Sequence, residues 1–170
     1  MSDPSVKFDS PLGRLRIVTN ATGLAQIAFS SRSDSQRLSR EDPISIHKTD
    51  DEILQKTLSW LDAYFLQRLA IHSIPPLDLQ GTAFQRLVWH HLCKIPWGKT
   101  LSYGEIARAI GHPKAVRAVG QACGANPIAI MVPCHRVLSA GLGLGGYAAG
   151  LERKRWLLAH EGAQARLPLD

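Results

Sequence analysis

The sequence lacks the features that define several protein classes. It has only three cysteines among 170 residues, so a disulfide framework is excluded and a reducing compartment is expected. No stretch approaches the roughly 20 consecutive apolar residues that span a bilayer, and no membrane partner is expected. The N-terminus has no basic start followed by an apolar run, so no secretory signal is expected. With 45% hydrophobic and 20% charged residues, the chain has the composition of a folded protein with a core.

Acidic residues are scarce in the second half of the chain. Residues 1–80 contain 9 Lys and Arg against 10 Asp and Glu, whereas residues 81–170 contain 11 against 4. The excess positive charge behind the net charge of +6 therefore lies entirely in the second half. Such a surface attracts polyanions over a Debye length of about 8–10 Å. Charge alone leaves two interpretations open, simple solubility and nucleic-acid binding.

The first half has the pattern of a small α/β domain. Apolar residues alternate on both sides of a Ser-Pro-Leu-Gly turn: Val6, Phe8, Leu15 and Ile17. They predict a β-hairpin, Ile27 and Phe29 indicate a third, antiparallel strand, and the polar residues 30–50 indicate a loop. Apolar residues then recur at helical spacing after Glu52: Leu54, Leu58, Leu61 and Phe65. Pro75-Pro76 favours an extended linker, so we expect a supporting domain at 1–80 and a second domain at 81–170.

The second half is predicted to be mostly helical, which makes the whole chain an α+β fold. Thr82 can cap a helix that ends at the Pro-Trp-Gly of residues 96–98. Its buried face is predicted from Phe84, Leu87, Val88, Leu92 and Ile95. A last helix is predicted over residues 151–160, with Gly162 as its stop signal.

Two short helices in this half have the outline of a helix-turn-helix. Ser102 can cap the first, and the second is predicted from Lys114 to about Gly124, after a Gly-His-Pro turn. The second would be the recognition helix, and it carries Arg117 and Gln121. Its other residues are mostly small, which allows close approach to a partner surface. Close helix packing inside the protein explains the small residues at least as well.

Cys134 has a chemically suggestive setting. His135 and Arg136 follow it directly. A thiol reacts as its thiolate, which a base and a positive charge favour, and these neighbours supply both. A buried packing cysteine remains an alternative, because adjacent side chains often diverge. Cys93 and Cys123 are expected to pack within helices, and no ligand pair at zinc-finger spacing accompanies Cys134.

Several ordered motifs in residues 82–162 resemble those of the methylated-DNA–protein-cysteine methyltransferases, also called O6-alkylguanine-DNA alkyltransferases. They are TAFQRLVWHHLCKIPW at 82–97, SYGE at 102–105, KAVRAVG at 114–120, GANP at 124–127, PCHRV at 133–137 and RKRWLLAHEG at 153–162. A lone Cys-His pair would be weak evidence, whereas this ordered set is specific. The N-terminal half resembles the family only through its Pro-Leu-Gly turn and general layout.

The resemblance implies direct reversal of DNA alkylation. The family cysteine, here Cys134, takes the alkyl group from O6 of guanine irreversibly, so each molecule acts once. His135 would act through water, backed by Glu161, and Asn126 would brace the active-site turn. Tyr103 would help to turn out the nucleotide and donate a proton or hydrogen bond to the departing guanine.

The resemblance also implies a set of DNA contacts and a base pocket. The damaged base must leave the stack, and Arg117 would fill the gap from the minor-groove side. The other expected DNA contacts are Tyr103, Lys114, Ala118, Gln121 and Arg136. The expected pocket residues are Val137, Cys123, Tyr147, Gly145, Gly146 and Ala148. The expected partner is double-stranded DNA containing O6-alkylguanine, with O4-alkylthymine as a second candidate lesion. We expect a monomer in the cytoplasm, at the nucleoid in a bacterium, with cooperativity on DNA left open.

Two departures from the family pattern bear on these expectations. The loop after Cys134 reads SAGLGLGGY at 139–147, where the family usually has an Asp-Gly turn and a Ser or Thr, and this leaves the range of accepted alkyl groups open. Some members hold zinc through N-terminal cysteines and histidines. This chain has no cysteine before Cys93, so neither a metal nor another cofactor is expected.

Two functions of other classes compete with alkyl transfer. A DNA-binding regulator or lesion sensor would bind DNA tightly, transfer no alkyl group and be indifferent to Cys134→Ser. Non-catalytic relatives of the family lack the cysteine, so the presence of Cys134 argues against that role. A cysteine hydrolase would instead turn over repeatedly on a small ester or peptide.

Overall fold

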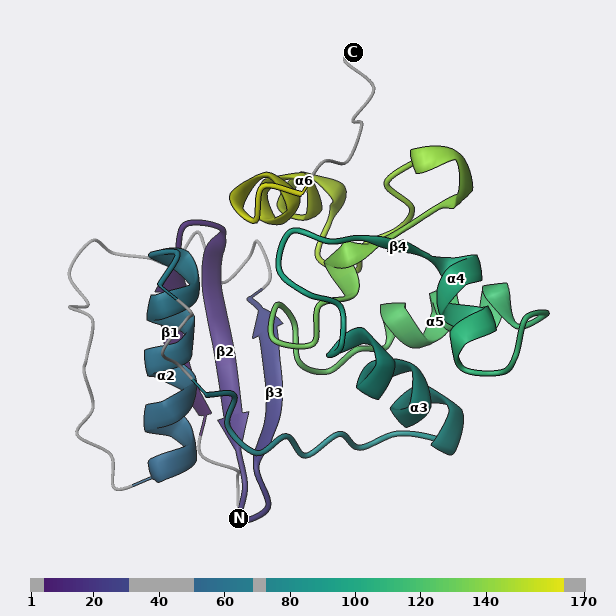
Figure 1. Ribbon diagram of the computed structural model, residues 1–170. Helices are drawn as coiled ribbons and strands as arrows, with labels where there is room; N and C mark the ends of the chain where they lie inside the picture. The colour runs from purple at the N-terminus through teal and green to yellow at the C-terminus, as the bar shows by residue number, and fades with distance from the viewer. Residues whose placement is uncertain (1–4, 31–50, 69–72, 164–170) are drawn as a thin grey trace. The chain divides into compact units, whose positions relative to one another are not determined.

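The chain forms two compact units, Met1–Asp78 and Leu79–Asp170 (Figure 1). The computed structural model describes residues 5–30, 51–68 and 73–163. Strands gather in the first unit and helices dominate the second, which confirms the predicted α+β fold. The expected loop at 30–50 lies outside the described residues except for Ser30.

The first unit is built on a three-stranded antiparallel sheet in the order β1-β2-β3. Its strands are β1 (Ser5–Ser10), β2 (Gly13–Thr19) and β3 (Leu24–Phe29). Val6 pairs with Ile17 and Phe8 with Leu15, so the predicted hairpin is confirmed. Leu15 and Ile17 are fully buried, because alternate residues of β2 point to one face of the sheet.

Helix α2 (Glu52–Phe65) lies against β2 and β3 (Figure 1). Its N-terminal residue is capped by Asp51, whose carboxylate accepts a hydrogen bond from the Leu54 backbone N–H. The helix is where the sequence predicts it, but its buried stripe is rotated. Leu58 and Phe65 are only half-buried, and Thr57, Trp60 and Tyr64 are buried beside Leu54 and Leu61.

Helix α3 (Ala83–Leu92) opens the second unit with the predicted cap. The Thr82 side chain accepts from the Gln85 backbone N–H, and the Gln85 side chain accepts from that of Thr82. One predicted core residue is wrong: Leu87 is 42% exposed. The neighbouring Trp89 is buried instead, and its indole Nε1 donates to the Ala122 carbonyl at 2.8 Å. This bond joins α3 to the recognition helix.

The helix-turn-helix consists of α4 (Tyr103–Ala109) and α5 (Val116–Gly124), which pack on one another. Ser102 caps α4 as predicted, and Glu105 completes a capping box. Gly111 takes a φ of +79° in the turn, a conformation that favours glycine. Helix α5 begins two residues later than predicted, because Lys114 still belongs to the turn that His112 closes by accepting from the Ala115 N–H.

The cysteine segment and the last helix complete the second unit. A 3₁₀ turn, η2 (Cys134–Arg136), leads into β5 (Val137–Leu138), which pairs in parallel with β4 (Leu101–Ser102). A second 3₁₀ turn, η3 (Ala140–Leu142), lies in the glycine-rich loop, and α6 (Leu151–His160) follows as predicted. Gly162 takes a φ of +63° after α6, as its predicted role as a stop requires.

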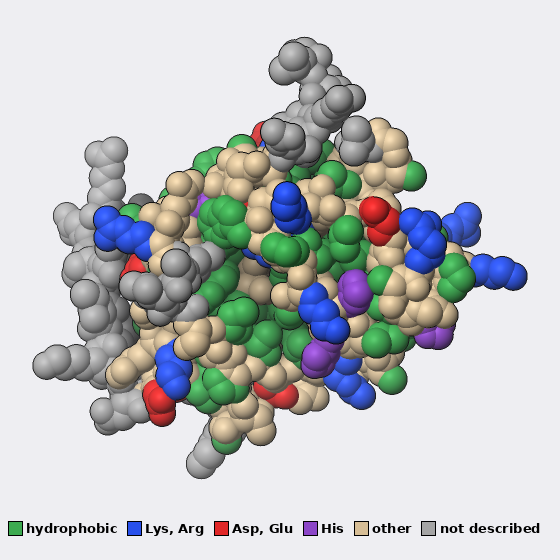
Figure 2. All heavy atoms as spheres, in the orientation of Figure 1, with side chains coloured by type: hydrophobic (Ala, Val, Ile, Leu, Met, Phe, Trp, Pro, Cys, Tyr) green, Lys and Arg blue, Asp and Glu red, His purple; other side chains and the backbone are tan. Residues whose placement is uncertain are grey.

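Lys and Arg side chains project from the part of the surface that α4 and α5 occupy (Figure 2). Arg117 on α5 and Lys114 in the turn before it are exposed. None of the helices formed by the described residues is both long and apolar enough to span a bilayer.

Candidate active site

Cys134 lies in the wall of a small cavity of about 110 Å³ within the second unit. The residue is 8% exposed, and the cavity gives its side chain a space to face. The lining combines residues from α4, α5, η2 and the glycine-rich loop: Tyr103, Gly120, Cys123, Gly124, Cys134, Gly146, Tyr147 and Ala148. The tertiary structure thus gathers at one point residues that are 45 positions apart in sequence.

Four of the six expected pocket residues line this cavity, namely Cys123, Gly146, Tyr147 and Ala148. The other two do not. Val137 is fully buried in β5, where it pairs with Leu101. Gly145 packs on Tyr103 instead: a Cβ at this glycine would lie 2.9 Å from the Tyr103 hydroxyl.

Gly120 and Gly124 line the cavity although the sequence reasoning did not select them. They lie four residues apart on α5, one helical turn, and so share a face. With Cys123 they form a small-residue wall. Their spacing is the signal that could have found them.

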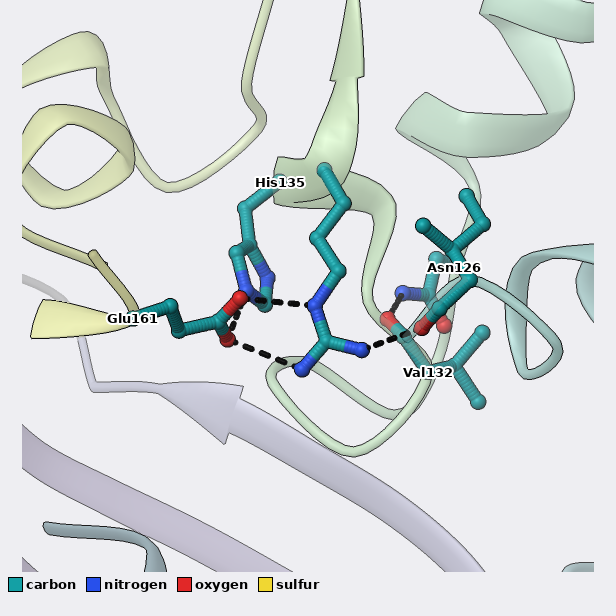
Figure 3. Close-up of polar contacts among 6 residues, drawn as sticks. Asn126, Val132, His135 and Glu161 are labelled. Carbon is teal, nitrogen blue, oxygen red and sulfur yellow. Dashed lines mark hydrogen bonds and ion pairs between the residues drawn. The ribbon is translucent and has the colours of Figure 1, made fainter. Parts of the chain in front are cut away.

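Asn126 braces the segment that leads to the cysteine. Its Nδ2 donates to the Val132 carbonyl at 2.7 Å (Figure 3). The same Nδ2 donates to Cys134 Sγ at 3.2 Å, and Oδ1 accepts from the Ile128 N–H at 3.0 Å. The segment needs bracing because Ile130, a buried β-branched residue, has a φ of +70°. One amide side chain therefore both fixes the turn and offers a donor to the sulfur.

His135 and Glu161 form a fully buried pair, and Figure 3 shows their side chains pointing toward one another. His135 Nε2 and Glu161 Oε1 are 2.7 Å apart. Burial lowers the pKa of His135, so the ring is neutral near pH 7 and Nε2–H donates to the carboxylate. Nδ1 then keeps its lone pair, and this atom is buried with no hydrogen-bond partner among the described residues. A neutral imidazole in this tautomer is a base.

Arg136 shares the same carboxylate, which corrects its expected role as a DNA contact. Its Nε donates to Glu161 Oε2 at 2.7 Å, and a second guanidinium nitrogen donates to the Ile95 carbonyl. The residue is 8% exposed, so this guanidinium is committed inside the protein and the DNA-contact prediction is wrong. Burial by itself raises the pKa of Glu161, but the hydrogen bonds from His135 and Arg136, together with the charge of Arg136, outweigh it and lower the pKa to about 2.

The environment of the Cys134 sulfur contains opposing influences. Burial raises the pKa of the Cys134 thiol, while the Asn126 hydrogen bond and the positive charge of Lys154 lower it. The nearby Cys123 has its pKa raised to about 12 by burial, so that thiol stays protonated. Of the two sulfurs that line the cavity, only Cys134 receives a hydrogen bond from an amide donor.

Lys154 is a site residue that the sequence reasoning missed. It is fully buried, and its Nζ donates to the Val137 carbonyl at 2.6 Å and to the Gly146 carbonyl at 3.0 Å. In the sequence it stands within Arg-Lys-Arg, which is typical of a solvated helix start. The signal was its spacing, since it lies three and four residues before Leu157 and Leu158, on the buried face of α6.

The recognition helix presents its predicted side chains to solvent. Lys114, Arg117 and Gln121 are exposed, and Ala118 is half-buried. Ala122, also a small residue of this helix, is only 2% exposed and packs toward α3. Small residues on α5 therefore serve internal packing as well as an outer face. Among the residues that the structure describes, no three His, Cys, Asp or Glu side chains are grouped to hold a metal ion.

Comparison with known proteins finds two family models that together span most of the chain. The DNA binding domain of 6-O-methylguanine DNA methyltransferase matches residues 83–163, and the ribonuclease-like domain of the same family matches residues 6–79. The methylated-DNA–protein-cysteine methyltransferase of Mycobacterium tuberculosis is 43% identical over 164 residues, 96% of this chain and 93% of that protein. That of Methanosarcina acetivorans is 42% identical over 156 residues, 92% of this chain and 96% of that protein.

A solved structure gives the same result. The crystal structure of Mycobacterium tuberculosis OGT in complex with DNA matches with a TM-score of 0.76 and 42% sequence identity, covering 92% of this chain and 91% of that chain. The chain belongs to the methylated-DNA–protein-cysteine methyltransferase family, as its ordered motifs predict.

Proposed function

We propose that this protein repairs alkylated DNA by moving the alkyl group of O6-alkylguanine onto Cys134. One observation carries the proposal. The Cys134 sulfur lies in the wall of a cavity, accepts a hydrogen bond from Asn126 Nδ2 at 3.2 Å, and is followed directly by a histidine that a buried carboxylate orients. A sulfur that only packs in a core needs neither an amide donor nor an oriented base.

The first step is formation of the thiolate. His135 accepts the thiol proton at Nδ1 through a bridging water, and Glu161 holds the ring in the tautomer that leaves Nδ1 free to do so. The charge of Arg136 keeps Glu161 ionised. Asn126 then stabilises the thiolate by donating to Sγ.

The second step is displacement at the alkyl carbon. A bond forms between Sγ and that carbon, the bond between the carbon and O6 breaks, and its electron pair moves to the guanine. Tyr103, which lines the cavity, donates a hydrogen bond or proton to the departing base. Burial raises the pKa of Tyr103, so the hydroxyl keeps its proton until it is needed. The thioether is stable, so the protein is consumed in one turnover, without a cofactor.

DNA binding is assigned to the helix-turn-helix of the unit that follows residue 80. Helix α5 approaches the minor groove, Arg117 occupies the gap left by the flipped nucleotide, and Lys114, Ala118 and Gln121 contact the DNA. Tyr147 and Gly146 close over the base. Residues 1–80 support this unit. The protein works as a monomer on damaged duplex DNA in the cytoplasm.

The test is the mass of the intact protein after incubation with duplex DNA that carries O6-methylguanine. We expect a gain of one methyl group in place of a hydrogen atom, at a stoichiometry no higher than one, and no gain for Cys134→Ser. Folded wild-type protein that binds the DNA and gains no mass would contradict the proposal and favour a lesion sensor. Repeated turnover on an ester or peptide would favour a hydrolase.

Arg117→Ala separates base flipping from phosphate binding. We expect methyl transfer from duplex DNA to slow by tenfold or more, and transfer from the free O6-methylguanine base to be unchanged. The measurement is the rate of methyl gain on both substrates. If Arg117 bound only a phosphate, the salt dependence of DNA affinity would instead fall by about one unit of log–log slope, with transfer from bound duplex unaffected.

A further inference from the structure

Lys154 is a buried cation whose place in the site is unusual. Removing an ammonium group from water costs several kcal/mol, so a lysine on a buried helix face must be compensated by good partners. Here the partners are two backbone carbonyls, those of Val137 and Gly146, at 2.6 and 3.0 Å from Nζ. The rest of the same face is apolar at Leu157 and Leu158.

The two carbonyls belong to opposite sides of the cavity. Val137 directly follows η2, the turn that carries Cys134. Gly146 belongs to the glycine-rich loop and lines the cavity. The Gly146 backbone also hydrogen-bonds to Tyr103. One ammonium therefore connects the cysteine segment to the loop at Gly146, the residue whose backbone also reaches the tyrosine.

Among the residues that the structure describes, the loop has few other hydrogen bonds that hold it in place. Residues 139–146 are Ser-Ala-Gly-Leu-Gly-Leu-Gly-Gly, a sequence with high conformational freedom and no charged side chain. Within this loop the Ser139 N–H donates to the Gly143 carbonyl. Gly145, with a φ of +67°, packs against Tyr103.

We propose that Lys154 is a positioning residue that holds the glycine-rich loop against the cysteine segment and whose positive charge favours the Cys134 thiolate. This inference rests on the proposed function, because it deepens the account of the same site. It assigns to α6 a task beyond carrying Glu161, which lies on the same buried face two turns further along.

The inference has a consequence for pH dependence. The titratable groups that face Lys154 are Cys134 and His135 on η2 and Cys123 on α5, whereas β5 and the loop offer only backbone carbonyls. Burial lowers the pKa of Lys154 to about 8. Above that pH Lys154 loses its charge while Cys134 continues to deprotonate. The two titrations therefore have opposite effects on the rate of methyl transfer.

The experiment compares Lys154→Met with wild type and with Arg155→Met, an exposed neighbour on the same helix. Methionine fills the buried stripe without a charge, and urea unfolding verifies that each variant is folded. We expect amide hydrogen exchange in residues 139–147 to be at least ~10-fold faster in Lys154→Met, and unchanged in Arg155→Met. The pH dependence of the carbamidomethylation of Cys134 by iodoacetamide measures the apparent pKa of this thiol. We expect that pKa to be higher in Lys154→Met than in wild type, and unchanged in Arg155→Met.

Two further outcomes distinguish a failure of this inference from a failure of the proposed function. In the methyl-transfer assay the wild-type rate should level off or fall above about pH 8, whereas Lys154→Met should start ~10-fold slower near pH 7 and keep rising. Unchanged exchange and an unchanged thiol pKa in Lys154→Met would overturn the inference. Absence of methyl transfer by wild type would overturn the proposed function alone, since exchange and thiol alkylation require no DNA.

Discussion

Glu161 shows how much of this site depends on single residues. It accepts hydrogen bonds from His135 and Arg136, and it is 3% exposed. The carboxylate orients the histidine, while the guanidinium compensates its charge. Glu161 needs both partners, because His135 must stay neutral to act as a base and cannot also balance the charge of the carboxylate.

The depressed pKa of Glu161 predicts a loss of stability in acid. A carboxyl with a pKa of about 2 in the folded state and 4.5 when unfolded stabilises the protein above pH 4.5, and this stabilisation is lost as the pH falls toward 2. We expect about 3 kcal/mol to be lost over this range. Urea unfolding across pH measures it. The Glu161→Gln variant should be less stable near pH 7, and the gap should close in acid; two parallel curves would contradict the assignment.

Asn126→Asp removes the donor to the sulfur while it keeps the Oδ1 contact that braces the turn at Ile128. Aspartate keeps an oxygen that accepts from the Ile128 N–H, but it cannot donate to Cys134 or Val132. We expect the apparent pKa of Cys134 to rise and methyl transfer to slow by about 10–100-fold, the range for a hydrogen bond to a charged group. Iodoacetamide reactivity against pH measures the first effect. If the Cys134 pKa did not move, Asn126 would only brace the turn.

At the scale of elements, the site is assembled from ends and turns more than from helix middles. Tyr103 is the first residue of α4, Cys134 the first of η2, and Glu161 the cap that follows α6. The capping box at Ser102 therefore does more than start a helix, because it also fixes where the Tyr103 side chain leaves the backbone. The Trp89 bond to Ala122 fixes α5 against α3 in the same way.

Gly145→Ala tests the contact between the glycine-rich loop and α4. A Cβ at this position would lie 2.9 Å from the Tyr103 ring and hydroxyl, so the tyrosine must move. Gly141→Ala is the matched control, because Gly141 also has a positive φ but has nothing within 4 Å of its Cβ position. Both variants should lose roughly 1–2 kcal/mol of stability from backbone strain. Only Gly145→Ala should slow methyl transfer by tenfold or more; equal rates would show that the loop does not position Tyr103.

At the scale of the whole molecule, charge and chemistry are placed in the same half of the chain. Residues 81–170 carry 11 Lys and Arg against 4 Asp and Glu, and they also contain every proposed catalytic group. Two of these cations, Arg136 and Lys154, are buried in the site and cannot contact DNA. The exposed ones include Arg117 on α5 and Lys114, which lies two residues before that helix.

DNA affinity should therefore fall steeply with salt. Each phosphate contact releases counterions and contributes about −0.9 to the slope of log affinity against log salt. We expect a slope of about −3 or steeper for undamaged duplex, measured by fluorescence anisotropy over a salt series. Lys114→Ala should reduce the slope by about one unit. A flat response would show that the positive charge of this half does not serve DNA binding.

Much of the fold and of the reacting pair could be predicted from the sequence alone, because the signals are local. The hairpin follows from alternation around one turn, α3 and α4 follow from their caps, and Cys134-His135 follows from an ordered set of motifs. The errors concern which face a residue takes. Leu87 and Trp89 are both compatible with an apolar stripe, and only the position of α5 decides that Trp89 is buried.

By itself the sequence determined the family motifs, the positive second half and the order of helices and strands. The tertiary structure alone decided that Arg136 is a buried partner of Glu161 rather than a DNA contact, and that Lys154 is part of the site. The physical reason is the nature of their partners. Both cations bind backbone carbonyls, at Ile95, Val137 and Gly146, and a carbonyl is present at every residue, so no letter of the sequence marks the one that a folded chain will bring within reach.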